Sequence, residues 1–266
     1  MSHDLRLLPL KTDSHPEWNI MVTDASLTAE IIAHAESFSG IKARVARLAD
    51  VLNGYSYQPA PEVETRKTNM DEAPVTNWPD EARSVLVFGS YHSMDDPRLD
   101  WWERGNSLGN RRLMDMAESL KLWLCKEHGR DSLPLPYHVE KGGLFLKDAA
   151  VFSGLGIIGR NNLLLHPEWG PRIRLRSILV EGDLQPTEPI EGFSPCESCE
   201  GFCQEACPVN AFPGGNYSRL ICRTQIKADV QNKGASGEID KNGSPILVVK
   251  YCRACELTCP VGVSQI

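Results

Sequence analysis

The sequence lacks the features that would place the protein in or across a membrane. No run of about 18 apolar residues occurs in its 266 residues, which argues against a spanning helix. The opening stretch MSHDLRLLPLKTDSHPEW has no basic segment followed by an apolar one and no twin arginine, so we expect no export signal. Positive charge is also scarce, because 28 Lys and Arg face 35 Asp and Glu, for a net charge of -7. We therefore expect a cytoplasmic protein without a general phosphate-binding surface.

What the sequence does contain is a concentration of cysteine. Eight of its nine cysteines fall between Cys196 and Cys259, and Cys125 stands apart from them. Cytosolic thiols are kept reduced, so eight clustered cysteines in such a chain indicate metal ligands rather than disulfides.

The composition changes along the chain in a way that indicates two parts. Hydrophobic residues make up 41% and charged residues 24%, which are ordinary values for a globular protein. From Glu191 onward Cys, Gly, Pro and polar residues dominate and leave little for a conventional core. We therefore predict an α/β (α+β) domain over 1–190 and a cysteine-rich module over 191–266, with a polar loop at 231–245.

Hydrophobic periodicity predicts the first elements of the α/β domain. Residues 26–53 have the pattern of a helix with a break near Gly40. Residues 55–82 are rich in Pro, Thr, Asn and Glu and predict an irregular segment. The apolar, β-branched run SVLVFGSYH, at 84–92, predicts a buried strand.

A longer helix is predicted over 110–128. Apolar residues recur there at helical spacing, namely Leu113, Ala117, Leu120 and Leu124. Gly129 supplies the stop signal. Cys125 lies within this helix, and we interpret it as a small core residue rather than a reactive thiol.

The stretch SGLGIIGRN fits G-x-G-x-x-G through Gly154, Gly156 and Gly159. A dinucleotide-binding fingerprint requires a strand before the glycines and a helix after them. Here a helix pattern over 144–152 comes first, and two strand patterns around a proline-rich turn follow within 161–184, which argues against NAD. Two interpretations remain: a tight turn that uses the positive φ open to glycine, or a loop that a flat or bulky ligand approaches closely.

The most specific signal is a pair of cysteine runs, CESCEGFCQEACP and CRACELTCP. Together with one cysteine between them they supply Cys196, Cys199, Cys203, Cys207, Cys222, Cys252, Cys255 and Cys259. Bacterial ferredoxins use C-x2-C-x2-C-x3-C-P, in which the cysteine before proline binds the other cluster of the pair. Two runs ending in Cys-Pro therefore predict two [4Fe–4S] clusters, although three residues rather than two separate Cys199 from Cys203. Structural zinc is the alternative, but zinc sites favour paired C-x2-C knuckles with longer separations.

These motifs occur together in a known family. The segment KDAAVFSGLGIIGRNNLLLHPEWG, then ILVEGDL, then the two cysteine runs, resemble the epoxyqueuosine reductases. Those are cobalamin-dependent iron–sulfur enzymes that remove an epoxide oxygen from a modified tRNA base, and reductive dehalogenases are more distant relatives. The resemblance covers about residues 84–262. It implies a nitroreductase-like cobalamin-binding domain followed by a ferredoxin-like double-cluster module.

The resemblance also implies which residues hold each cofactor. One cluster would be held by Cys196, Cys199, Cys203 and Cys259, and the other by Cys207, Cys222, Cys252 and Cys255. The family's glycine loop lies against the corrin ring, which implies contacts from Gly154, Leu155, Gly156, Ile157, Gly159 and Asn161. The chemistry is consistent, because Co(I) cobalamin needs a low-potential donor and cysteine-ligated clusters reach low potentials. A ferredoxin or flavodoxin is implied as the external electron donor.

The family's proposed proton donor is an aspartate upstream of the glycine loop. Counting back without gaps places Glu140 at that position, with one methylene more. A partly buried carboxyl can act as a general acid. His138 would lie on the same side if this segment is a strand, and is a second candidate donor. The alternative is a solvated glutamate beside Lys141.

The segment PRIRLRS alternates arginine with apolar residues. A strand would place Arg172, Arg174 and Arg176 on one face. One interpretation is an anion site for a phosphate, a carboxylate or the polar periphery of a corrinoid. The other is a solvated outer face.

Several departures from the family bear on the substrate. The sequence ends at Ile266, so we expect no helical-repeat domain of the kind that helps epoxyqueuosine reductases bind tRNA. The chain has Ile157 and Arg160 where the family has an aromatic residue and a lysine, and Val261–Gly262 in place of Trp-Asn. We expect a reductase of a small-molecule or nucleotide substrate, with tRNA as one candidate. The alternatives are a ferredoxin-like electron-transfer protein and a corrinoid-handling protein without a substrate of its own.

Overall fold

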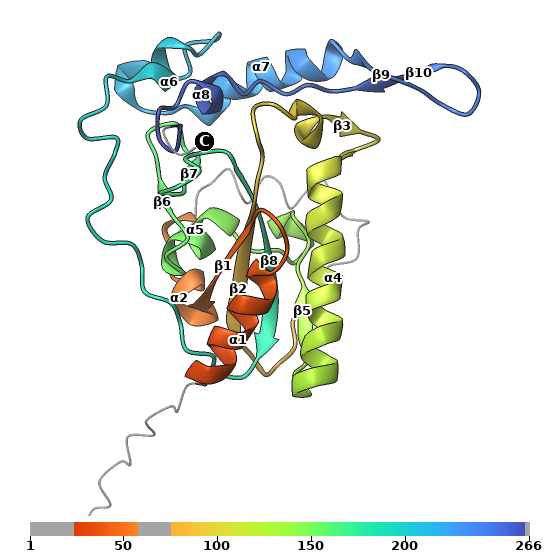
Figure 1. Cartoon of the computed structure of the whole chain (residues 1–266). Helices are drawn as coiled ribbons and strands as arrows, with labels where there is room; N and C mark the ends of the chain where they lie inside the picture. Colours follow the sequence, from red (N-terminus) through yellow and green to blue (C-terminus); the bar gives the residue numbers. More distant parts are fainter. Residues whose placement is uncertain (1–23, 58–75, 264–266) are drawn as a thin grey trace, which may run out of the picture.

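A four-stranded antiparallel sheet forms the centre of the molecule (Figure 1). The computed structural model describes residues 24–57 and 76–263. The strand order is β1 (Ile41–Arg47), β2 (Ala82–Tyr91), β8 (Ile173–Glu181) and β5 (Ser132–Pro134). Helices α1 (Ala25–Glu36) and α4 (Leu108–His128) cover one face, and α2 (Leu48–Leu52) and α5 (Leu146–Phe152) cover the other. The predicted mixing of helices and strands is confirmed, with every neighbouring strand pair antiparallel.

Strand β2 is buried on both of its faces. Leu86 and Phe88 enter the core beneath α1 and α4, whereas Val85 and Val87 enter the core beneath α2 and α5. Because both faces are covered, the strand has a continuous apolar run instead of an alternating one. The strand predicted over 84–92 is confirmed, and the burial of both faces explains the apolar run that predicted it.

Helix α4 matches its sequence prediction closely. The Ser107 hydroxyl accepts the Asn110 backbone N–H at 3.2 Å, which caps the first turn. Gly129 ends the helix in the left-handed region with φ +61°. Cys125 is exposed, so its interpretation as a core residue is wrong. The neighbouring Leu124 occupies the buried side of the helix in its place.

The helix predicted over 26–53 is wrong in its second half. After α1 the chain forms strand β1, and a short α2 follows it. Ala43 and Val45 enter one core and Ala46 enters the other, while pairing with β2 supplies the backbone hydrogen bonds. This long-range pairing outweighs the helix propensity of Ala and Arg. Of the irregular segment predicted over 55–82, residues 58–75 lie outside the described residues.

The predicted helix and strands around the glycine motif are confirmed as α5, β7 (Leu164–Leu165) and β8. Strand β7, however, pairs with β6 (Ile157–Ile158) inside the glycine motif and not with β8. Three further short elements position the site described below: η2 (Pro97–Asp100), β3 (Trp102–Glu103) and η3 (Val139–Lys141). No helix in the described ranges is long and apolar enough to cross a bilayer.

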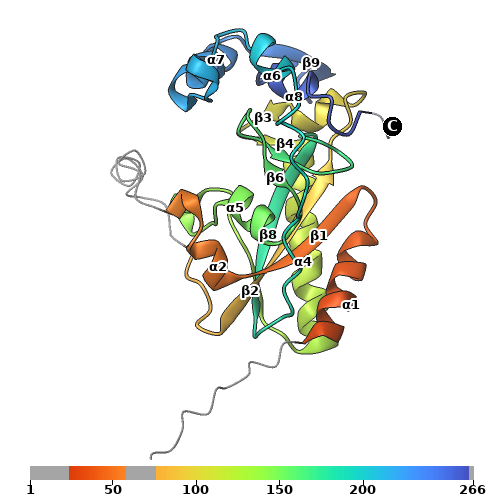
Figure 2. The ribbon, with the colours of Figure 1, turned by 90° about the vertical axis from the view of Figure 1, so that its left-hand side faces the viewer.

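The cysteine-rich part lies at one end of the sheet, where β2 ends and β8 begins (Figures 1 and 2). Its elements are α6 (Phe202–Glu205), α7 (Arg219–Gln231), β9 (Gly234–Ile239), β10 (Pro245–Val248) and α8 (Ala254–Leu257). The polar loop predicted over 231–245 is wrong, because β9 and β10 pair as an antiparallel hairpin. Polar and glycine-rich hairpins have weak alternation, which explains why the pattern was missed.

Candidate cluster-binding site

The eight clustered cysteines line two separate cavities, four to each. The first cysteine cavity is narrow and is lined by Cys196, Cys199, Cys203 and Cys259. The second cysteine cavity, of about 300 Å³, is lined by Cys207, Cys222, Cys252 and Cys255. All eight are free thiols. The division coincides with the two ligand sets that the family resemblance implies. In the described part of the chain, no three His, Cys, Asp or Glu side chains are placed to bind a single metal ion.

A glycine accommodates the irregular spacing of the first run. Gly201 is one of the three residues between Cys199 and Cys203 and takes φ +92°, a conformation that glycine adopts without a Cβ penalty. From there its N–H donates a hydrogen bond to Cys199 Sγ at 3.5 Å. In the second cavity the Ala211 N–H donates to Cys207 Sγ at 3.2 Å. Such N–H donors stabilise sulfur ligands in their anionic form.

The cavities are unfavourable for uncompensated thiolates. Burial raises the pKa of Cys203, Cys252 and Cys259, and it raises the pKa of Cys255 to about 12. The other cysteines of each cavity add to this effect by repulsion of like charge. Four thiolates in one cavity therefore require positive charge close by, which is what a bound metal centre supplies.

The end of the glycine loop contacts both cysteine cavities. Asn161 is buried, and its side-chain amide donates to the Cys255 carbonyl at 3.1 Å while its oxygen accepts the Leu163 N–H. Arg160 donates to the Cys199 carbonyl at 3.4 Å. Both residues also line the first cysteine cavity. The glycine loop and the cysteine-rich part are thus one continuous site.

Arg172 fixes the end of the second cysteine run to the sheet. It is fully buried and donates to the carbonyls of Cys259 and Val261. Gly170 lies against the backbone of that same segment, because a Cβ on Gly170 would collide with the Val261 carbonyl. The position of Cys259 therefore depends on the residue that leads into β8 as well as on its own loop.

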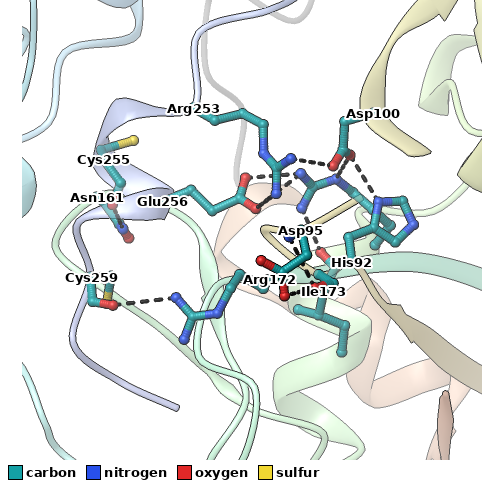
Figure 3. A network of polar contacts seen from close by, with 12 residues as sticks. His92, Asp95, Asp100, Asn161, Arg172, Ile173, Arg253, Cys255, Glu256 and Cys259 are labelled. Atoms are coloured by element: carbon teal, nitrogen blue, oxygen red, sulfur yellow. Dashed lines mark hydrogen bonds and ion pairs between the residues drawn. The ribbon is translucent and has the colours of Figure 1, made fainter. Parts of the chain in front are cut away.

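Four charged side chains form a closed ring between the sheet and the second cysteine run (Figure 3). Arg174 lies 2.7 Å from Asp100 and 2.8 Å from Glu256, and Arg253 lies 2.7 Å from Asp100 and 2.6 Å from Glu256. His92 makes a 2.9 Å contact with Asp100 through Nδ1. We name the four charged residues the charge ring. It holds α8, which carries Cys255 of the second cysteine cavity, against strand β8.

The ring sets the ionisation of Asp100. Burial alone would raise the pKa of Asp100, but the hydrogen bond with His92 and the charges of Arg174 and Arg253 outweigh it and lower the pKa. The carboxylate is therefore charged at neutral pH, as the paired guanidinium groups require.

The arginine segment is not the solvated outer face that was one of its two predicted roles. Arg172 and Arg176 are buried, so the solvated outer face is wrong. Arg174 is paired in the charge ring, and Arg176 donates to the Asn110 side chain and the Leu135 carbonyl. These arginines hold protein groups together, and their donors are directed at the chain itself.

The glycine motif is explained in large part by the fold. Gly154 has φ +72°, and a Cβ there would collide with the Glu188 carbonyl. A Cβ on Gly156 would lie 2.6 Å from the Leu165 carbonyl oxygen, and one on Gly159 would lie 2.7 Å from Leu165 Cδ1. Leu155 is buried in the core, whereas Ile157 is half-buried. The positive-φ turn is thus confirmed for Gly154, and the other two glycines permit close approach by the chain's own residues.

The two candidate proton donors lie on a 3-10 turn and not on a strand. His138 precedes η3 and Glu140 lies within it, so the strand geometry assumed for them is wrong. His138 Nδ1 lies 3.8 Å from Glu140 Oε1, with His138 54% exposed and Glu140 21% exposed. Trp78 Nε1 donates to the Gly142 carbonyl at 2.6 Å and holds the turn in place.

Sequence reasoning missed most of the charge ring. Arg253 and Glu256 lie inside the second cysteine run, where two unlike charges between cysteines are a detectable signal. Asp100 and His92 precede that run by about 150 residues of sequence. Nothing local to them indicates a partner in the cysteine-rich part.

Comparison with known proteins shows sequence similarity to epoxyqueuosine reductases and to tetrachloroethene reductive dehalogenases. No protein-family model matches the chain. It is 25% identical over 185 residues to an epoxyqueuosine reductase of Lactococcus garvieae, covering 69% of this chain and 49% of that protein. It is 30% identical over 149 residues to a tetrachloroethene reductive dehalogenase of Sulfurospirillum multivorans, covering 52% of this chain and 28% of that protein. The solved epoxyqueuosine reductase of Streptococcus thermophilus has a TM-score of 0.62 at 18% identity, covering 89% of this chain and 66% of that one.

The resemblance stated from the sequence is therefore confirmed. The chain is epoxyqueuosine reductase-like in sequence and has the same fold over most of its length. It spans about half the length of the first of these relatives and less than a third of the second.

Proposed function

We propose that this protein is an iron–sulfur, cobalamin-dependent reductase that acts on a small-molecule or nucleotide substrate. The observation that carries the proposal is the pair of four-cysteine cavities joined through Asn161 to the glycine loop. In this proposal residues 1–190 form the cobalamin-binding domain and residues 191–266 form the cluster module. The epoxyqueuosine reductases among the relatives support a reductase.

The residues present fit two [4Fe–4S] clusters. Each cavity offers four thiols, each contains a cysteine that accepts a backbone N–H bond, and none of the eight is consumed in a disulfide. When bound, such clusters supply low-potential electron storage. Cys196, Cys199, Cys203 and Cys259 would hold one, and Cys207, Cys222, Cys252 and Cys255 would hold the other. Arg172 lowers the pKa of Cys259 against the larger effect of burial, and so favours the ligating thiolate.

The glycine loop is the part of the chain that we propose to hold the corrinoid. Its half-buried residues Ile157 and Gly159 adjoin Arg160 and Asn161, which line the first cysteine cavity. Leu155 and Asn161 are buried against protein, so side-chain contacts would come from Ile157 and backbone contacts from the glycines. When bound, cobalamin supplies a strongly reducing cobalt centre.

We propose Glu140 as the proton donor and His138 as its partner. Glu140 is largely shielded from solvent and its carboxylate faces the more exposed imidazole of His138. A shielded carboxyl next to an exposed base can be reprotonated from solvent after each turnover. A solved epoxyqueuosine reductase of Bacillus subtilis is described with an aspartate-bearing catalytic loop that swings out of the active site, which supports a carboxyl donor on a loop.

The substrate class that we propose, small molecules and nucleotides, is taken from the relatives. One solved epoxyqueuosine reductase binds an epoxyqueuosine-modified tRNA stem loop, which supports a nucleotide substrate. We propose a cytoplasmic protein served by a ferredoxin or flavodoxin. Epoxides and modified tRNA stem loops are therefore the first substrates to test.

The test is anaerobic reconstitution with iron and sulfide followed by titration with hydroxocobalamin. Retained cobalamin with a base-off Co(II) EPR signal, and reduction of an epoxide substrate, are the expected results. Iron uptake without cobalamin uptake would contradict the proposal and indicate an electron-transfer protein. Cobalamin that is bound and then released to an acceptor, without any substrate reduced, would indicate a corrinoid-handling protein.

A further inference from the structure

We propose that the outer face of helix α7 is the docking surface for a small acidic electron-transfer protein. The inference rests on the proposed function, because it presumes that the cysteine cavities hold redox centres. In each encounter one electron leaves the donor and one enters the cluster module, and no covalent bond forms or breaks.

The first observation is a stripe of cations on α7. Arg219, Arg223 and Lys227 are spaced four residues apart, which places them along one side of a helix. All three are exposed. Within the described residues none of them makes an ion pair or a side-chain hydrogen bond. We name these three residues the α7 stripe. Unpaired cations in a row offer a partner charge that the protein itself does not neutralise.

Apolar side chains lie within the same face. Leu220 is 63% exposed and Val230 is 42% exposed, and helical geometry places both beside the α7 stripe. The helix has no buried residue. Exposed apolar groups bordered by charge are the composition of a transient protein interface, in which the apolar part binds and the charge orients.

The same helix forms a wall of the second cysteine cavity. It supplies the ligand candidate Cys222, and Gln225 and Ile226 also line that cavity. Ile226 is itself 39% exposed, so a single side chain reaches from the cavity to the surface. Figures 1 and 2 show α7 at the edge of the molecule away from the sheet. A carrier docked on α7 would lie next to the second cavity, and the first cavity lies on the glycine-loop side.

The distribution of charge around the cavities favours an acidic partner at this helix, where three exposed cations stand in a row, whereas the first cavity has the single exposed Arg160. The whole chain is acidic, with a net charge of -7. The first cysteine run carries exposed Glu197, Glu200 and Glu205, which repel an acidic partner from the first cavity. The α7 stripe attracts one to the second cavity. Attraction by the α7 stripe and repulsion by the first cysteine run would together orient an acidic partner as it approaches the protein.

RNA is the competing occupant, and the α7 face suits it less. Single-stranded RNA is bound by aromatic side chains that stack on bases, together with cations that contact phosphates. The α7 sequence RLICRTQIKADVQ contains no aromatic residue. Its exposed apolar groups are aliphatic, as in a protein interface.

The experiment compares two charge-reversal variants that have the same net charge. The first is Arg219→Glu/Arg223→Glu/Lys227→Glu, on the α7 stripe. The second is Arg47→Glu/Arg83→Glu/Lys126→Glu, three exposed cations in the sheet domain, at the end of the sheet away from the cysteines. Each protein is reconstituted anaerobically and its iron content is matched to wild type. The probe is a chemically reduced flavodoxin of strongly negative charge, and the readouts are its binding constant and its bimolecular rate of electron transfer.

The α7 variant is expected to bind the flavodoxin about tenfold or more weakly at low salt, with the transfer rate falling in parallel. The control variant is expected to change much less, and photoreduction by deazaflavin is expected to be unchanged in both. Equal losses in the two variants, or none, would overturn the proposal while leaving the reductase intact. Loss of RNA stem-loop binding in the α7 variant with unchanged flavodoxin transfer would assign the surface to nucleic acid. Failure of the wild-type chain to take up iron would overturn both the docking surface and the proposed function.

Discussion

Arg174 and Glu256 form the ion pair that joins the central sheet to the second cysteine run, with Nη2 of Arg174 2.8 Å from Oε2 of Glu256. Glu256 directly follows the ligand candidate Cys255, and Arg174 lies in strand β8. The pair is closed into a ring by Asp100 and Arg253 (Figure 3). A displacement of strand β8 at Arg174 would therefore move the segment that carries Cys255 of the second cysteine cavity.

Removing one member of the charge ring is expected to destabilise the protein. Arg174→Met leaves Glu256 and Asp100 with only Arg253 to neutralise them, in a buried setting. Breaking a buried ion pair costs about 3 kcal/mol, and less where the side chain is partly exposed, as Arg174 is. We expect a lower thermal midpoint for the reconstituted protein and a changed EPR spectrum of the second-cavity centre.

The matched control for this prediction is Arg111→Met. Arg111 is exposed on α4 and has no ion-pair partner among the described residues. Its substitution should change stability by less than about 0.5 kcal/mol. Equal effects of the two substitutions would show that the charge ring contributes nothing specific.

Two glycines with nearly the same φ allow the energetic cost of backbone conformation to be measured apart from the cost of close packing. Gly154 has φ +72° and Gly192 has φ +71°, but only Gly154 has a neighbour that a Cβ would meet, the Glu188 carbonyl. Gly192→Ala should cost about 1–2 kcal/mol from conformation alone. Gly154→Ala should cost about 3–5 kcal/mol, because displacement of the Glu188 backbone is added. Thermal unfolding of the two variants measures the difference, and similar losses would contradict the packing at Gly154.

His166 is expected to make stability depend on pH between about 4 and 6.5. Burial lowers the pKa of His166 from 6.5 to about 4, and its Nδ1 accepts the backbone N–H groups of Glu168 and Trp169. The depressed pKa means that the unfolded chain takes up a proton first as the pH falls. The stabilisation is thus complete above pH 6.5 and declines toward pH 4, by about 3 kcal/mol in all.

The variant that tests this is His166→Asn, whose side-chain oxygen can accept the same backbone donors without titrating. The difference in thermal midpoint between wild type and His166→Asn should shrink or reverse as the pH falls from 7 to 4.5. A difference that stays constant over that range would show that His166 does not titrate on unfolding.

Glu140→Gln should lower turnover without weakening substrate binding. The amide keeps the shape of the side chain but cannot donate the proton, and loss of a general acid costs about 10²–10⁴-fold in rate. We expect kcat to fall and KM to stay near the wild-type value. His138→Gln is the companion variant and should reduce the rate much less. The reverse order of effects would make His138 the donor.

Local signals in the sequence predicted the elements that depend on local interactions. The continuous apolar run of β2 and the capped, periodic helix α4 were both identified, because each pattern lies within one segment. The cysteine runs were recognised for the same reason, and the structure places their eight cysteines around two cavities. The exposure of Cys125 was missed, since its position on α4 next to Leu124 depends on which side of the helix meets the sheet.

Features that depend on distant residues were not predictable from the sequence. Strand β1 has helix-favouring residues and becomes a strand only by pairing with β2. Arg174 of β8 was predicted to face solvent or an anion, but its partners Asp100 and Glu256 lie in segments far along the chain. In both cases tertiary contacts override the local pattern.

The central claim is that the eight cysteines form two independent four-ligand sites. The most direct measurement is the iron and sulfide content of the reconstituted protein, with EPR after reduction, for wild type and for Cys222→Ala, Cys259→Ala and Cys125→Ala. The account predicts about eight irons for wild type and for Cys125→Ala, and about four for each of the other two, with different residual EPR signals. Binding of zinc without sulfide, or the same residual signal from Cys222→Ala and Cys259→Ala, would contradict it.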